Sequence, residues 1–282
     1  MNFFKDVLKG VVIGIANAIP GVSGGTMMVS MGIYDKIIYS VTHLFSQLKK
    51  SIMTLLPYFV GMAVGIVGLA FCIKALYANV PFQTSMLFIG LILGGIPILT
   101  GHLKGKKIGV PHVVVFLIFF AGIILMQYLG GAGEDVVLTT DLVSLIKLFF
   151  VGVIASATMV IPGVSGSMML MIMGYYNPVI TSITDFITAL KAGDVQQLLH
   201  FCIILIPFGL GVVIGIFAIA KVIEILLEKF EALTYCAIMG LVISSPVVIL
   251  MGTAMAGITV LTVLTGVVTL AVGVGIALCL GK

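Results

Sequence analysis

The sequence contains no arginine and no tryptophan, and only 9% of its 282 residues are charged. All 14 basic residues are therefore lysines. Without guanidinium groups, a bound anion must be held by ammonium groups, hydroxyls and backbone amides. The net charge of +4 is too small to indicate nucleic-acid binding.

Metal-binding and disulfide patterns are also absent from the sequence. The four cysteines are scattered through apolar runs without C-x-x-C spacing, and the four histidines are equally dispersed. We therefore expect the cysteines to serve packing, and we expect no metal site. No aspartate or glutamate lies deep in an apolar run, so the sequence predicts neither a buried carboxylate relay nor a catalytic residue.

Apolar residues, in contrast, make up 61% of the chain, and the mean hydropathy is +1.33. A soluble chain of this length could not bury so much apolar surface, so the composition indicates an all-α polytopic membrane protein. Six apolar runs are long enough to cross a bilayer. They cover approximately residues 52–74, 82–101, 110–130, 198–221, 232–252 and 255–280.

One motif occurs twice, as Ile-Pro-Gly-Val-Ser-Gly-Gly-Thr at residues 19–26 and as Ile-Pro-Gly-Val-Ser-Gly-Ser-Met at residues 161–168. Proline lacks a backbone N–H and glycine tolerates unusual backbone angles, so a Pro-Gly pair ends a helix. The serine that follows is a favoured N-cap. Each copy therefore predicts a helix that ends and begins again within apolar surroundings. The predicted breaks are Pro20, Gly21, Pro162 and Gly163, and the predicted N-caps are Ser23 and Ser165.

The duplication extends over the whole chain. Residues 5–34 match residues 147–176 at an offset of 142, and residues 57–90 match residues 207–240 at an offset of 150. The sequence therefore predicts a single membrane domain, 1–282, made of repeat 1 (1–130), an acidic connecting loop (131–140) and repeat 2 (141–282). Each repeat holds one broken helix pair followed by three membrane-spanning helices.

The lysines predict how the two repeats are oriented. If each broken pair is re-entrant and returns to its own side, repeat 2 is inverted, and 11 of the 14 lysines face one side. If each broken segment crosses once, the best orientation collects only 7 of the 14. The positive-inside rule therefore favours inverted repeats with both termini cytoplasmic, and we expect the N-terminus to be mature structure. Full crossing by both halves of each segment gives the same sidedness and stays open.

Inverted repeats with broken helices often bring two helix N-termini together near the middle of the membrane. Free amides, hydroxyls and the helix dipoles can then stabilise an anion. The predicted phosphate-binding residues are Ser23, Gly24, Gly25, Thr26, Ser165, Gly166 and Ser167, with Asn17 and Thr158 as weaker candidates. The alternative is that the motif only lets helices bend and pack closely. The Gly61/Gly65 and Gly211/Gly215 pairs are expected to be helix-packing faces.

The motif, its shorter second copy and the segment Met31-Gly32-Ile33-Tyr34 resemble a bacterial and archaeal membrane family, the polyprenyl-phosphate translocases of the PopT type. The resemblance covers essentially the whole chain. It implies transport of undecaprenyl phosphate, or its archaeal analogue, from the outer to the inner leaflet for reuse in envelope synthesis. Ser167 and Met168 depart from the Gly25 and Thr26 of the fuller motif, so the two halves need not act alike.

The sequence thus predicts a multi-pass lipid transporter of a cytoplasmic membrane, with polyprenyl phosphate and the bilayer as its partners and without a cofactor. A coupling ion, H⁺ or Na⁺, and the oligomeric state stay open. The main alternative is an ion-coupled transporter of a small soluble anion. A polyprenyl pyrophosphate phosphatase is disfavoured because the chain has no arginine and no intramembrane glutamate for acid–base chemistry.

Overall fold

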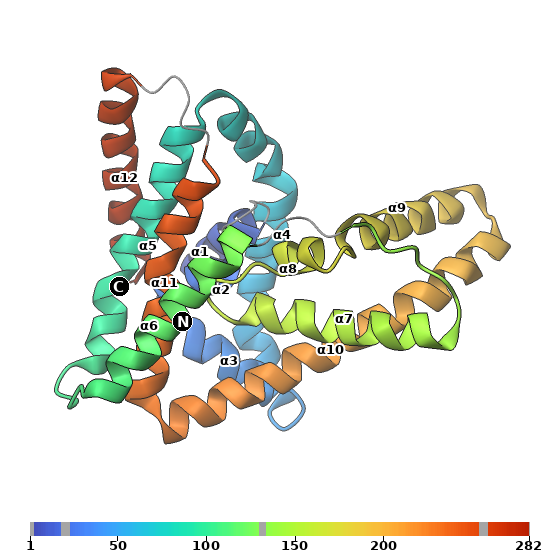
Figure 1. Ribbon diagram of the computed structural model, residues 1–282, viewed down its shortest axis with the longest axis horizontal. Helices are drawn as coiled ribbons and strands as arrows, with labels where there is room; N and C mark the ends of the chain where they lie inside the picture. Colours follow the sequence, from blue (N-terminus) through green and yellow to red (C-terminus); the bar gives the residue numbers. More distant parts are fainter. Residues whose placement is uncertain (1–2, 18–22, 130–133, 254–258, 282) are drawn as a thin grey trace. The chain divides into compact units, whose positions relative to one another are not determined.

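The computed structural model describes residues 3–17, 23–129, 134–253 and 259–281, and all regular structure in these ranges is α-helical (Figure 1). The helices are α1 (Phe3–Asn17), α2 (Gly24–Ser30), α3 (Tyr34–Thr42), α4 (Leu48–Asn79), α5 (Pro81–Leu103), α6 (Val110–Leu129), α7 (Leu142–Val160), α8 (Gly166–Ile172), α9 (Tyr176–Ala192), α10 (Val195–Lys229), α11 (Glu231–Met251) and α12 (Val260–Gly281). The six predicted apolar runs correspond to α4, α5, α6, α10, α11 and α12, so the all-helical prediction is confirmed.

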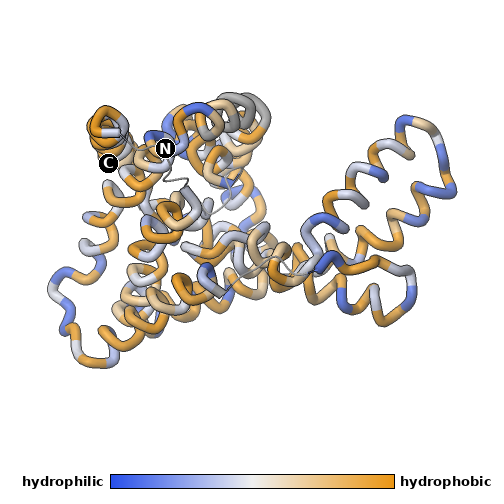
Figure 2. The backbone as a smooth tube through the Cα atoms, turned by 45° about the horizontal axis from the view of Figure 1, so that its top comes forward, coloured by the Kyte–Doolittle hydropathy of each residue, from blue (hydrophilic) through white to orange (hydrophobic). Residues whose placement is uncertain are grey.

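Six helices in the described ranges are long and apolar enough to cross a membrane: α5, α6, α7, α10, α11 and α12. Figure 2 shows apolar residues along most of the helical path, with hydrophilic residues gathered at turns and connecting segments. Such a distribution is typical of a multi-pass membrane protein, because apolar side chains face lipid as well as the interior.

The broken segments have unequal arms. In repeat 1 the arms are α1, with 15 residues, and α2, with 7; in repeat 2 they are α7, with 19 residues, and α8, with 7. At 1.5 Å per residue, the second arm of each pair is only about 10 Å long. The two arms of each pair therefore differ in reach, and α7 alone is long enough to cross a membrane.

The chain forms two compact units. Unit 1 contains Met1–Gln127, Ile161–Val164 and Ala220–Lys282, and unit 2 contains Tyr128–Val160 and Ser165–Ile219. The four residues Ile161–Val164, which include the second Pro-Gly break, thus belong to unit 1, whereas α7 and α8 on either side belong to unit 2.

Glycines let helices approach closely within each unit. In unit 1, a Cβ added to Gly61 of α4 would lie 2.1 Å from the Val7 carbonyl oxygen of α1. In unit 2, a Cβ added to Gly211 of α10 would lie 2.0 Å from the Phe149 carbonyl oxygen of α7. Such contacts between backbones stabilise helix pairs in membranes through dispersion forces. The predicted packing role of the two glycine pairs is confirmed.

A second kind of glycine contact joins helices from different repeats within unit 1. A Cβ on Gly90 of α5 would lie 2.1 Å from the Leu270 carbonyl oxygen of α12. The matching residue in repeat 2, Gly240 of α11, would place a Cβ 2.4 Å from the Phe116 carbonyl oxygen of α6. The second long helix of each repeat, counted from α4 or α10, therefore packs against the last helix of the other repeat: α5 contacts α12, and α11 contacts α6.

A polar network connects α1, α3 and α4 in unit 1. The Tyr58 hydroxyl donates a hydrogen bond to Asp6 Oδ1 at 2.8 Å, and the Lys36 ammonium donates to the Tyr58 oxygen at 3.0 Å. Lys36 Nζ also lies 3.4 Å from Asp6 Oδ2. The residues of repeat 2 that match Asp6 and Tyr58 are Leu148 and Phe208, which belong to an apolar cluster. Only repeat 1 therefore stabilises this position with charges.

We expect Asp6→Leu to destabilise the protein by about 2 kcal/mol, because the buried Tyr58 hydroxyl loses its charged acceptor. Asp6→Leu combined with Tyr58→Phe reproduces the Leu148 and Phe208 pair of repeat 2, and should be less destabilising than the sum of the two single changes. Thermal unfolding of the detergent-solubilised protein measures these differences. Strictly additive losses would show that the network is not coupled.

Candidate functional site

The two copies of the motif fold in the same way locally. Ser23 has φ −101° and ψ 129°, and Ser165 has φ −99° and ψ 127°. Both serines stand at the N-cap position of a seven-residue helix, α2 or α8, as the sequence predicted. Neither serine, however, makes a side-chain cap hydrogen bond.

A matching glycine follows each short helix, two residues after its last residue. Gly32 has φ 65° and Gly174 has φ 75°, angles that favour glycine because it has no Cβ. The amide of the residue after each glycine, Ile33 or Tyr175, donates to a carbonyl five residues back, as in a Schellman motif. The helices that follow, α3 and α9, were not predicted from the sequence. Gly32 and Gly174 were the sequence features that could have indicated where α2 and α8 end and the next helices begin.

In the first motif, the Gly24 amide and the Thr26 hydroxyl already have protein partners. The Gly24 amide donates to Asn17 Oδ1 at 3.1 Å. Thr26 is fully buried, and its Oγ1 accepts a hydrogen bond from the Gly163 amide at 2.7 Å. The Ser23 hydroxyl is buried and has no hydrogen-bond partner within the described ranges. The predicted breaks Pro20 and Gly21 lie outside the described residues.

The second break is well defined. α7 ends at Val160 and α8 begins at Gly166, so Pro162 and Gly163 lie between two helices. Gly163 has φ 83°, and a Cβ there would lie 2.7 Å from the Leu241 carbonyl oxygen. Its neighbours Ile161 and Val164 pack in an apolar cluster with residues of α6 and α11, namely Ile123, Met126, Leu241 and Val248. The break is thus seated in the core of unit 1.

The residues after this break are partly exposed, except for Gly166. The Ser165 and Ser167 hydroxyl oxygens lie 2.8 Å apart and share a hydrogen bond. A Cβ on Gly166 would lie 2.4 Å from Met159 Cγ, and Met159 is the residue that matches Asn17 in the repeat. A thioether is a much weaker acceptor than an amide oxygen. The weaker candidate Thr158 uses its hydroxyl within its own helix, donating to the Ala155 carbonyl at 2.8 Å.

Residues 13–267 match the family model described as undecaprenyl phosphate translocase-like (VCA0040-like). The chain belongs to this family. It is 29% identical over 253 residues to a polyprenyl-phosphate transporter of Staphylococcus aureus, covering 87% of this chain and 86% of that protein. It is 28% identical over 260 residues to a polyprenyl-phosphate transporter of Vibrio cholerae serotype O1, covering 87% of this chain and 77% of that protein. No solved structure matches the chain.

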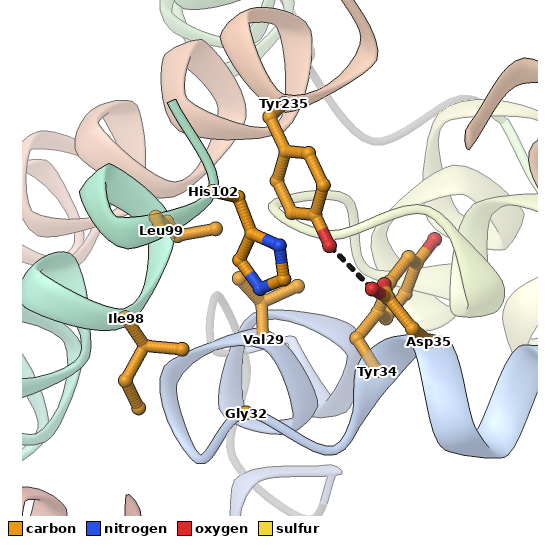
Figure 3. Close-up of a pocket in the computed structure, with 8 residues that line it drawn as sticks. All are labelled: Val29, Gly32, Tyr34, Asp35, Ile98, Leu99, His102 and Tyr235. Atoms are coloured by element: carbon orange, nitrogen blue, oxygen red, sulfur yellow. Dashed lines mark hydrogen bonds between the residues drawn. The ribbon is translucent and has the colours of Figure 1, made fainter. Parts of the chain in front are cut away.

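This translocase-like chain also holds a polar pocket that the sequence analysis missed. In unit 1, the Tyr235 hydroxyl of α11 donates to Asp35 Oδ2 of α3, and the His102 ring stacks on Tyr235 with centroids 4.2 Å apart (Figure 3). These side chains, with Val29 and Gly32 near the end of α2, line a cavity of about 30 Å³. Nothing local in the sequence links Asp35 to Tyr235, 200 residues away.

Asp35 also lines a larger cavity of about 240 Å³ in unit 1. Three further carboxylates line this cavity, from Glu224, Glu228 and Glu231. The Lys221 ammonium donates to Glu224 Oε2 at 2.6 Å, and His43 Nδ1 lies 3.2 Å from Glu224 Oε1. The cavity therefore favours cations over anions, unlike the predicted phosphate site. No group of three His, Cys, Asp or Glu side chains within the described ranges is arranged to hold a metal ion.

Proposed function

We propose that the chain transports polyprenyl phosphate, specifically undecaprenyl phosphate, from the outer to the inner leaflet of a cytoplasmic membrane. Membership of the undecaprenyl phosphate translocase-like family carries the transport function, and the chain is not an enzyme. The single structural observation that supports the site is the hydrogen bond from the Gly163 amide to Thr26 Oγ1, because it joins the first motif to the break of the second within unit 1.

The charged headgroup of the substrate is much harder to move across a bilayer than its apolar tail. A polyprenyl tail is already stable in hydrocarbon, whereas a charge at the bilayer centre costs several kcal/mol at least. Charge-assisted hydrogen bonds of about 1.5–3 kcal/mol each offset that cost for an anion. In our proposal, the amides and hydroxyls of both motifs bind the phosphate, and the tail stays in lipid. The proposed ligands are Ser23, Gly24, Gly25, Thr26, Ser165, Gly166 and Ser167, as the sequence predicted.

We further propose that the repeats are inverted and that both termini are cytoplasmic. The lysine distribution supports this orientation. The exchange of helix partners within unit 1 supports a two-fold relation, since α5 contacts α12 while the matching α11 contacts α6. Inverted repeats of this kind can expose one site alternately to the two sides of a membrane.

The second candidate is an ion-coupled transporter of a small soluble anion, for which the carboxylate-lined cavity near Asp35 would attract the coupling cation. A lipid transporter needs a site open to the bilayer, whereas a small-anion transporter needs a closed, water-accessible pocket. Competition separates the two. Inorganic phosphate at a concentration equal to that of the lipid should not displace polyprenyl phosphate if the tail contributes to binding.

Reconstitution into liposomes tests the proposal. We expect labelled polyprenyl phosphate to exchange between leaflets faster in proteoliposomes than in protein-free liposomes. Imposed proton or sodium gradients then show whether transport is coupled to an ion. Equal exchange in the two preparations would overturn the proposed function, and release of phosphate from the pyrophosphate lipid would reveal the phosphatase activity that we exclude.

A further inference from the structure

Thr26 lies in a fully buried position where residues from three distant parts of the chain meet. Its Oγ1 accepts the Gly163 amide proton at 2.7 Å and lies 3.5 Å from Ser245 Oγ of α11. Ser245 Oγ in turn donates to the Leu241 carbonyl at 3.1 Å. All of these atoms belong to unit 1. The Thr26 hydroxyl oxygen thus serves as an acceptor inside the protein.

The hydrogen bond from the Gly163 amide to Thr26 holds the second break against the first motif. The apolar cluster around Val164 holds the break without directional bonds, and the close approach to Leu241 only excludes a side chain at Gly163. The hydrogen bond to Thr26 is directional and requires a particular orientation of the Gly163 peptide. The Gly163 amide is half-buried, and leaving such an amide without a partner costs up to about 1–3 kcal/mol, so the bond favours one backbone arrangement.

Repeat 2 has no hydroxyl at the position of Thr26. The residue that matches Thr26 is Met168, whose thioether is a weak acceptor. Asn17 differs from its repeat in the same way: it accepts a hydrogen bond from the Gly24 amide, and the matching residue is Met159. At both positions, repeat 1 uses a polar side chain to hold a backbone amide where repeat 2 has methionine. The two motifs are therefore chemically unequal.

We infer that Thr26 is a positioning residue that orients the second break, and that it does not bind the headgroup itself. The inference rests on the proposed function and changes the role of one of its ligands. Ser165 and Gly166 follow Gly163 by two and three residues, so only a few peptide units separate them from the hydrogen-bonded amide. Consecutive Cα atoms are about 3.8 Å apart, which leaves little slack over this distance.

The test compares Thr26→Val, which keeps the shape but removes the acceptor, with Thr26→Ser, which keeps the hydroxyl. Thr84→Val is the matched control, because Thr84 is also buried in unit 1 and its hydroxyl donates to the Val80 carbonyl of its own helical turn. Hydrogen exchange of the Gly163 amide should become about tenfold faster in Thr26→Val. It should stay near the wild-type rate in Thr26→Ser and Thr84→Val.

Transport kinetics distinguish positioning from headgroup binding. We expect Thr26→Val to lower the maximal rate in proteoliposomes about tenfold with an unchanged half-saturating lipid concentration, and Thr26→Ser to restore it. A raised half-saturating concentration with unchanged exchange at Gly163 would overturn the inference, since it would make Thr26 a ligand. If Thr26→Val does not fold, Thr26→Ala replaces it, and the expected acceleration of hydrogen exchange at the Gly163 amide is the same. Absence of transport by the wild type would refute the proposed function alone, because the exchange comparison still decides the Thr26 contact.

Discussion

Transport of polyprenyl phosphate is expected to fall at least about a hundredfold when Gly24 and Gly166 are both replaced by valine. A Cβ at Gly24 would lie 2.4 Å from Asn17 Oδ1, and a Cβ at Gly166 would lie 2.4 Å from Met159 Cγ and 3.0 Å from the Ala155 carbonyl oxygen. Valine would therefore cover both backbones that we propose to approach the phosphate. Losing two charge-assisted hydrogen bonds of about 1.5 kcal/mol each corresponds to about a hundredfold.

Gly122→Val and Gly275→Val provide the matched control, because a Cβ at either glycine has open space around it. Both control residues lie in long helices, α6 and α12, so they report the general cost of valine in place of glycine. The comparison uses initial rates of leaflet exchange, normalised to the amount of folded protein recovered in the liposomes. Transport by the double variant at the wild-type rate would show that the headgroup does not approach these backbones.

Short-range signals in the sequence were sufficient to predict much of this fold. Apolar runs predicted six long helices, since a span needs about 20 apolar residues whatever surrounds it. The Pro-Gly break and the N-cap position of Ser165 follow from backbone preferences that act within a few residues. The packing role of Gly211 could be predicted because small residues four apart leave a groove on a helix.

Contacts between distant residues could not be predicted in this way. Thr26 bonds to Gly163, 137 residues later, and Asp35 accepts a hydrogen bond from Tyr235, 200 residues later. The motif alone made Thr26 a phosphate ligand, because a hydroxyl at a helix start has the right chemistry. Its hydrogen bond with Gly163 depends on the position of the second break, which packs against residues of α6 and α11.

The same limit explains the missed role of Asp6. Beside Lys5 and Lys9 near the start of the chain, Asp6 has the pattern of a solvated, interfacial residue. In the structure it is buried and bonded to Tyr58, and the Lys9 ammonium donates to the Met31 carbonyl at 3.2 Å, at the end of α2. The charged residues of α1 thus help to hold the helix that carries the first motif, which local sequence does not reveal.

Replacing Gly273 with valine is expected to have the largest effect on stability. Gly273 of α12 faces Gly90 of α5, and a Cβ at Gly273 would lie 2.2 Å from the Leu87 carbonyl oxygen. Backbone atoms cannot rotate away as side chains do, so α5 and α12 must separate. Overpacking costs typically about 1–3 kcal/mol, and here the lost helix contact adds to it.

The displacement should also reach the first motif, because α5 supports α2. A Cβ at Gly95 of α5 would lie only 2.3 Å from Ser30 Cα of α2, so these two backbones are in direct contact. Gly275→Val, two residues further along α12 in open space, is the matched control. We expect Gly273→Val to lower the melting temperature in detergent and to accelerate hydrogen exchange in α2, and Gly275→Val to do neither. Equal melting temperatures for the two variants would mean that the contact between α5 and α12 does not hold unit 1 together.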